Sequence, residues 1–542
     1  LELIGFDPQI IKIHPDNCPS SSLLINAQFK TSYGAKLLGV PIGSDDFIYS
    51  SLNESINDLN TTADHLLTLN DHQSRLCLIT KCFEAKPRYL MRNITPILMK
   101  DFKAEHKNIQ IKLLSRVFGT TIPNAPQARV YDLCSLPNKN FGFGIADPDI
   151  LSRCAFIASS LSHHKDAKAL KNFCIEFHNS PRIKCLQQLL VLSELAGPNK
   201  TYVENAQKFY AFKVSPGESR QSLLYQHYCQ NKITNLKNAF TASSDTISLS
   251  VLAANNSKEA TCCFSVLPTN PKYKLSNKEL QTNLCYKYSL PLPQHKNRSF
   301  SCICGEANPD PHHLISGCQN GGFSVKTHNA INRELADICK FSNLHFTFED
   351  RSFKNRFEGG LVDAHGNSHP TVIPDITIHN PQLLGYPPNV SKVLLDVSVV
   401  GYTAGLRNNT TPNAAFKNPT NQLQIRYQSK ISKYTRFLEL YKSQPGIIDH
   451  NVYEVIPIVI LSTGTIHPKS QEFIAKLAER AQEVHEMERG NLMTWFIRRM
   501  VFALMRGISD TLHGKVVPLP AGPRDYTIDP NLIQNEQSWG AD

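Results

Sequence analysis

Two short β-branched runs, each carrying one aspartate, constrain this sequence more than any other feature. Residues 371–378 contain Asp375, and residues 392–400 contain Asp396. Turn-forming residues bound both runs, so each is predicted to be a strand. A carboxylate in such apolar surroundings is costly to bury unless it is paired or binds a cation. The two aspartates are therefore candidate ligands for Mg²⁺, which prefers hard oxygen atoms.

Side chains alternate along a strand, so Asp396 and Ser398 are expected on one face with Leu394. Residues 420–442 follow, with apolar side chains at spacings of three and four, and they are predicted to form an amphipathic helix. Lys430 falls beside its apolar stripe and is the candidate to point inward. The alternative is that Asp396 ends a buried strand and that the Lys430 amine extends to solvent.

A dense group of cysteines and histidines predicts a second metal site. Cys302, Cys304, His313 and Cys318 follow the spacing C-x-C-x8-H-x4-C. Three thiolates and one imidazole suit tetrahedral Zn²⁺, and Gly305 can supply the sharp turn that the first pair of ligands needs. His312 is an alternative ligand. The competing interpretation is a loop in which these residues are unrelated.

Composition sets the broad class of protein. A chain of 542 residues predicts two to four domains, and a hydrophobic content of 41% predicts folded cores. The net charge of +11 is compatible with a polyanionic partner. Fifteen scattered cysteines suggest reduced thiols and an intracellular setting, and no apolar run is long enough to predict a membrane span. Because the first residue is Leu, we expect a fragment of a longer reading frame or a processed piece.

Several stretches occur in an order that resembles one known family. They are KLLGVPIG at 36–43, PRYLMR at 87–92, LPNKNFGFGI at 136–145, the cysteine-histidine group, CQNGG at 318–322, KTHNAINREL at 326–335, and then the Pro-Asp and Asp-x-Ser strands. Together they resemble the C-terminal part of a non-LTR retrotransposon reverse transcriptase with a restriction-like PD-(D/E)XK endonuclease. That family places a lysine two residues after the second acid, where this sequence has Ser398. In some members the lysine comes from a neighbouring helix instead, as Lys430 would here.

The resemblance implies a multidomain fold. Its mainly α-helical N-terminal half is followed by a small zinc knuckle and an α/β restriction-endonuclease-like C-terminal domain. The expected divisions are 1–44 (end of the polymerase palm with a primer-grip-like turn), 45–120 (thumb-like helices), 121–298 (helical connector), 299–325 (CCHC zinc knuckle), 326–515 (endonuclease) and 516–542 (flexible tail). Within the endonuclease, periodicity predicts a helix over 327–341, a strand over 453–461 beside the Asp396 strand, and two helices from 468 to about 515.

By the same resemblance the protein nicks target DNA to prime reverse transcription of the element RNA. It would use Mg²⁺ or Mn²⁺ on Asp375 and Asp396, with Lys430 assisting and Glu334 as a weak further ligand. Nucleic-acid contacts are expected from Lys36, Arg88, Arg92, Lys326 and His328.

The polymerase aspartates would lie upstream of residue 1, so reverse transcriptase activity is not expected from this fragment alone. A nuclear location is expected if the protein is active, and the sequence leaves its oligomeric state open. Two alternatives remain: a catalytically inactive DNA- or RNA-binding remnant of a retroelement, and a host nuclease of repair or recombination.

Overall fold

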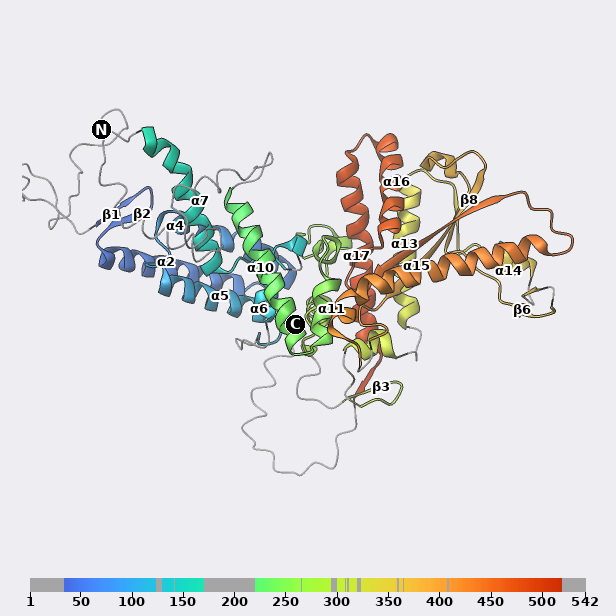
Figure 1. The fold of residues 1–542 in the computed structure, drawn as a ribbon, viewed down its shortest axis with the longest axis horizontal. Helices are drawn as coiled ribbons and strands as arrows, with labels where there is room; N and C mark the ends of the chain where they lie inside the picture. The colour runs from blue at the N-terminus through green and yellow to red at the C-terminus, as the bar shows by residue number, and fades with distance from the viewer. Residues whose placement is uncertain are drawn as a thin grey trace, which may run out of the picture.

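The computed structural model shows a mainly helical, multidomain protein with a small mixed sheet. It describes residues 34–122, 129–140, 142–169, 220–264, 266–293, 300–307, 309, 311–318, 323–357, 360–363, 365–406 and 409–518. Figure 1 shows two lobes side by side along the longest axis. We call them the N-terminal lobe, from β1 (Gly34–Leu37) to α10 (Arg220–Ala242), and the C-terminal lobe, from β3 (Phe300–Cys302) to β10 (Val516–Pro518). Within the described ranges, no helix is both long and apolar enough to cross a membrane.

The N-terminal lobe is a hairpin followed by packed helices. Its elements are β1 (Gly34–Leu37), β2 (Val40–Gly43), α2 (Asp45–Leu67), α3 (His72–Lys81), α4 (Arg88–Asn93), α5 (Lys100–Phe118), α6 (Val130–Cys134), α7 (Pro148–Ala169) and α10 (Arg220–Ala242). The first helices start where side chains cap them: Ser44 accepts the Phe47 N–H, and Asp71 accepts those of Gln73 and Ser74. The turn expected in residues 36–43 is that of the β1–β2 hairpin, where Leu38 and Gly39 both have positive φ.

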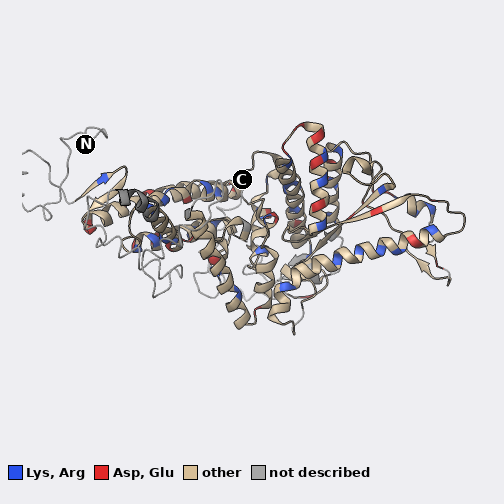
Figure 2. Cartoon of the chain, turned by 45° about the horizontal axis from the view of Figure 1, so that its top comes forward, with Lys and Arg blue, Asp and Glu red and all other residues tan. Residues whose placement is uncertain are grey.

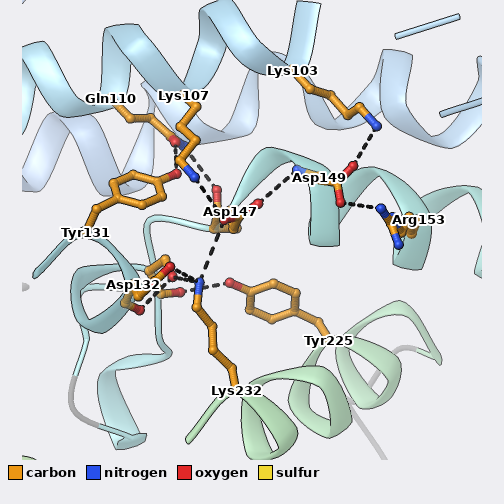
Figure 3. A network of polar contacts seen from close by, with 12 residues as sticks. Lys103, Lys107, Gln110, Tyr131, Asp132, Asp147, Asp149, Arg153, Tyr225 and Lys232 are labelled. Atoms are coloured by element: carbon orange, nitrogen blue, oxygen red, sulfur yellow. Dashed lines mark hydrogen bonds and ion pairs between the residues drawn. The ribbon is translucent and has the colours of Figure 1, made fainter. Parts of the chain in front are cut away.

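A polar network fastens α10 to the other helices of this lobe (Figure 3). The Lys232 amine on α10 lies 2.8 Å from Asp132 Oδ1 and 3.7 Å from Asp147 Oδ2, and it donates to Ser135 Oγ. The Tyr225 hydroxyl donates to the Ser135 carbonyl at 2.8 Å. Because Lys232 is largely buried and contacts two carboxylates, α10 is held in one position by charge as well as by packing.

Two further helices, α11 (Thr246–Ala254) and α12 (Asn277–Lys287), connect the lobes. The Ser250 hydroxyl donates to the Tyr402 carbonyl at 2.9 Å, and the Tyr402 hydroxyl donates to the Tyr286 carbonyl at 3.0 Å. The Tyr286 hydroxyl in turn lies 2.7 Å from Ser462 Oγ. All four side chains are buried, so this chain of hydrogen bonds fixes the connecting helices against the C-terminal lobe.

The C-terminal lobe is built on a four-stranded sheet with the order β4-β7-β8-β9. Its strands are β4 (Phe346–Phe348), β7 (Ile376–Ile378), β8 (Val390–Val400) and β9 (Val452–Leu461). The pairs β4–β7 and β7–β8 are antiparallel, whereas β8 and β9 are parallel. The prediction that 453–461 forms a strand beside the Asp396 strand is confirmed. The strand predicted over 371–378 is shorter than expected, and Pro374, which lacks an N–H, precedes it.

Helices cover both faces of this sheet. They are α13 (Phe323–Phe341), α15 (Pro412–Ser443), α16 (Pro468–His485) and α17 (Arg489–Gly514). Val393, Leu395 and Val397 of β8 join the core that contains residues of α13, α16 and α17. Leu394, on the opposite face, packs in a separate cluster with Tyr434 and Phe437 of α15. The alternation expected for β8 is therefore present, and Asp396 shares the α15 face.

One expected boundary is wrong. The flexible tail expected over 516–542 does not begin at 516, because Val516–Pro518 form strand β10, which pairs antiparallel with β3 (Phe300–Cys302). The β-branched Val516 and Val517 suit this pairing. Residues 519–542 lie outside the described ranges. The two helices predicted between 468 and 515 are present as α16 and α17.

Candidate active site and metal centre

The antiparallel pairing of β7 with β8 brings the two aspartates near one another. Ile376, the first residue of β7, lies opposite Leu395. Asp375 directly precedes β7, and its N–H donates to the Leu395 carbonyl at 2.9 Å, one residue out of the register of the strand pair. Asp375 therefore lies beside the stretch of β8 that contains Asp396.

Asp375 is held by its neighbours on two elements. Its Oδ2 atom accepts the Val397 N–H at 2.6 Å and lies 3.1 Å from Nε2 of His328 on α13. The hydrogen bond to Asp375 raises the pKa of His328 above its ordinary value, burial opposes the rise, and the charge of Asp396 adds to it. The Asp396 charge therefore also acts on His328, which indicates that both carboxylates and the imidazole share one small region.

Asp396 is paired from α15. The Lys430 amine donates to Asp396 Oδ1 at 2.6 Å. One helical turn on, the Tyr434 hydroxyl donates to the Ile373 carbonyl at 3.4 Å, and burial together with the charge of Asp396 raises the Tyr434 pKa far above its ordinary value. The Asp396 side chain is only 7% exposed, whereas those of Lys430 and His328 are 21% and 31% exposed. Solvent therefore reaches the pair at the side formed by Lys430 and His328.

The donor atoms fit a hard divalent cation. Among the described residues, both hydrogen bonds made by the Asp375 carboxylate use Oδ2, so Oδ1 is the atom that can bind an ion. Asp396 supplies a second carboxylate nearby. Two carboxylates with room for water match what Mg²⁺ or Mn²⁺ takes from proteins. A cation here would also offset negative charge that Lys430 balances at Asp396.

Other residues singled out from the sequence lie elsewhere. Glu334, the weak third acid, is 2.6 Å from the Arg499 guanidinium of α17, so its carboxylate is already neutralised away from the Asp pair. Lys36 pairs with Glu54 at 2.6 Å, and Arg88 Nε donates to the Glu84 carbonyl. Arg92 Nε donates to Gln221 Oε1 at 3.0 Å, and Lys326 is exposed near the start of α13.

The cysteine-histidine group is a compact cluster. Ligand atoms of Cys302, Cys304, His313 and Cys318 all lie within 4.8 Å of one another. The Sγ atoms of Cys302 and Cys318 are 3.3 Å apart, and Cys304 Sγ is 3.3 Å from His313 Nε2. A tetrahedral zinc with Zn–S bonds of about 2.3 Å needs sulfur atoms a little further apart, at about 3.8 Å. A small expansion of the cluster would therefore hold a metal ion such as zinc.

The turn between the first two ligands shows how they meet. Gly305 has a positive φ of 93°, and its N–H donates to the Cys302 carbonyl at 2.8 Å. The Cys302 N–H donates to the Glu306 carbonyl at 2.8 Å, which closes the turn. A hydrogen bond from the Glu306 backbone lowers the pKa of the exposed Cys304 thiol to about 7, whereas burial raises that of Cys302 to about 11.

Glu306 is a residue that the sequence did not single out. Its Oε2 atom lies 2.8 Å from His313 Nδ1, while His313 Nε2 faces Cys304. A carboxylate on the far nitrogen is the usual way to orient a metal-binding histidine. Its position two residues after Cys304 is the only sign in the sequence that Glu306 could contact a ligand of the cluster. His312, the alternative ligand, instead packs on Tyr286 and Tyr402, with Nε2 3.3 Å from Ser289 Oγ.

Comparison with known proteins adds no family to this description. No protein-family model matches the sequence, and no curated protein matches it.

Proposed function

We propose that the C-terminal lobe is a metal-dependent DNA endonuclease of the PD-(D/E)XK type, part of a retrotransposon protein that nicks target DNA to prime reverse transcription. The observation that carries the proposal is the proximity of two acids and an amine: the Asp375 carboxylate accepts the N–H of Val397, next to Asp396, and the Lys430 amine lies 2.6 Å from Asp396. The order of the sequence stretches described above supports the assignment to a retroelement.

The residues of the site take separate roles in this proposal. Asp375 and Asp396 would hold a divalent ion, which lowers the pKa of a bound water and stabilises charge on phosphate. Lys430 supplies a positive charge beside Asp396 and is placed to orient the attacking water. His328 and the Val397 N–H fix the Asp375 carboxylate. The lysine that the family usually carries on the strand is replaced by Ser398, so Lys430 would take its place.

A basic flank of α15 offers a path for the DNA backbone. This helix carries six Lys or Arg and one acid, and Figure 2 shows the basic residues recurring along its length. Arg426, Lys433 and Arg436 are exposed and lie at spacings of three, four and six residues from Lys430, which places them on its flank of the helix. Arg426 and Arg436 are ten positions apart, so they span about 15 Å of the helix, enough to face about four phosphates of one strand.

The direct experiment uses supercoiled plasmid and the full chain. With Mg²⁺ or Mn²⁺ we expect conversion to the open-circular form, and with the metal omitted we expect none. Conversion that is independent of metal would contradict the proposal.

Lys430→Met should lower the nicking rate by about 10²-fold, the scale of a positioned catalytic group, and leave DNA affinity within about twofold. Lys417→Met is the matched control, since Lys417 is exposed on the opposite flank of the same helix and should leave the rate unchanged. A melting curve for each variant checks that loss of the Asp396 partner has not unfolded the lobe. Equal rates for the two variants would remove Lys430 from the mechanism.

Replacing Arg426, Lys433 and Arg436 together with Gln should weaken duplex binding and its dependence on salt. Each lost phosphate contact lowers the slope of log affinity against log salt by about one, so the triple variant should lose up to about three. Binding isotherms at several salt concentrations measure the slope, with Lys417→Gln as control. A slope like that of the unchanged protein would place the DNA elsewhere.

A second function is favoured by one observation: Asp396 is buried and already paired with Lys430. An acid neutralised in this way is also what a catalytically inactive, nucleic-acid-binding remnant of a retroelement would retain. That alternative predicts salt-sensitive binding of DNA or RNA, no nicking under any metal condition, and no effect of changes at Asp375 on binding.

A further inference from the structure

Lys515, which directly follows α17, is a buried cation beside the cysteine-histidine cluster. The residue is only 2% exposed. Its amine donates to the Leu314 carbonyl at 2.8 Å and to the Cys318 carbonyl at 2.9 Å. These carbonyls belong to one ligand and to the neighbour of another, His313. The amine therefore fixes the backbone of the second half of the cluster.

The backbone of the same residue holds the first half. The Ile303 N–H, between Cys302 and Cys304, donates to the Lys515 carbonyl at 2.9 Å. The next residue, Val516, lies opposite Cys302 in the β3–β10 pairing. Each of the four ligands is thus bonded to Lys515 or Val516, or adjoins a residue that is. The two ligand pairs lie in separate segments of the cluster, and this junction joins both of them to the end of α17.

Charge gives the amine a second effect. Three thiolates, one neutral imidazole and a divalent ion carry a net charge of −1, and Glu306 adds another negative charge at His313. A buried cation hydrogen-bonded to the backbone of this group lowers its electrostatic energy, and the effect is large because little water screens it. An apolar side chain of similar length would fill the space but supply neither the charge nor the donors.

We propose that Lys515 is a positioning residue of the metal centre, which sets its affinity for the ion and couples metal binding to the end of α17. The inference depends on the cluster binding metal and is independent of the nuclease proposal. The cluster then has a structural role, because with metal bound the knuckle, β10 and α17 form one unit.

The first test compares Lys515→Met with Lys469→Met, a control at an exposed lysine on α16. Co²⁺ titration follows the thiolate charge-transfer and d–d bands, and chelator competition gives the Zn²⁺ affinity. We expect Lys515→Met to bind both ions about 10- to 100-fold more weakly, the usual effect of losing an outer-shell partner, with the four-ligand spectrum preserved. The Lys469 control should match the unchanged protein. Equal affinities for all three proteins would overturn the proposal.

The second test needs no variant, so a folding defect cannot confound it. Limited trypsin digestion of the full chain is compared with and without EDTA, and cleavage after Lys515 is quantified by mass spectrometry. Lys287, also buried but on α12 and outside the cluster, is the internal control. Removal of metal should expose Lys515 and leave Lys287 protected. Unchanged cleavage at Lys515, or equal exposure of both lysines, would contradict a specific link between the metal and Lys515.

Discussion

Replacing Asp396 with Asn is expected to reduce plasmid nicking by at least about 10³-fold. The amide keeps an oxygen for the Lys430 amine, which lies 2.6 Å from the carboxylate, but it removes the charge that would hold a divalent ion. A bound metal contributes several kcal/mol to stabilising a phosphoryl-transfer transition state, and about 4 kcal/mol corresponds to about 10³ in rate. Asp375→Asn should have an effect of the same order, since the Asp375 carboxylate contacts the N–H of Val397, the neighbour of Asp396.

The control is Asp510→Asn, which removes a carboxylate from an exposed position on α17. Its nicking rate should equal that of the unchanged protein. Calorimetric titration with Mg²⁺ should show binding to the unchanged protein and to the Asp510 variant, and weaker or undetectable binding to the other two. DNA affinity without metal should be similar in all four proteins. Nicking that survives Asp396→Asn would count against the proposed site, and absence of nicking from all four would favour the binding remnant.

Local patterns predict much of the C-terminal lobe. Alternation in β8 places Leu394 and Asp396 together opposite Val393 and Leu395, and that is how they pack. Helical periodicity places Lys430 beside the apolar stripe of α15, and the helix does bring its amine to Asp396. These patterns succeed because the polarity of each face of a strand or helix must suit the side chains or solvent that the face contacts. Local patterns do not predict strand β10 at the end of the lobe. This strand forms by pairing with β3, far earlier in the chain, and no local pattern indicates such a partner.

The partners of the site residues are harder to predict. As a polar residue on a helix, His328 is expected to contact phosphate, yet it lies 3.1 Å from Asp375, a contact between residues 47 positions apart. In the sequence Tyr434 is only part of an apolar stripe, because a tyrosine at helical spacing gives no sign of where its hydroxyl ends. Glu334 is an acid on the expected helix, and its partner Arg499 comes from a helix that only the tertiary fold brings close. Each of these contacts depends on the packing of helices on the sheet.

Removing one ligand of the cysteine-histidine cluster should have the largest effect on metal content. We expect Cys304→Ser to bind Zn²⁺ at least about 10²-fold more weakly, because serine replaces a thiolate in a site that needs four soft or borderline donors. Cys304 is exposed, so the change leaves no cavity and a loss of metal cannot be attributed to poorer packing. Cys82→Ser, at an exposed thiol outside the cluster, is the matched control and should retain one zinc per chain. Metal analysis after dialysis and chelator competition measure the difference.

Substitutions of the adjacent residues His312 and His313 test which of them is the fourth metal ligand. His313→Asn should lose metal like Cys304→Ser, because His313 Nε2 faces Cys304 while Nδ1 is held by Glu306. His312→Asn should keep the metal, although it removes a buried ring from contact with Tyr286 and Tyr402 and should lower the melting temperature. The two changes thus predict opposite pairs of outcomes in metal content and stability. Retention of zinc by the His313 variant together with its loss from the His312 variant would reverse the assignment of the fourth ligand.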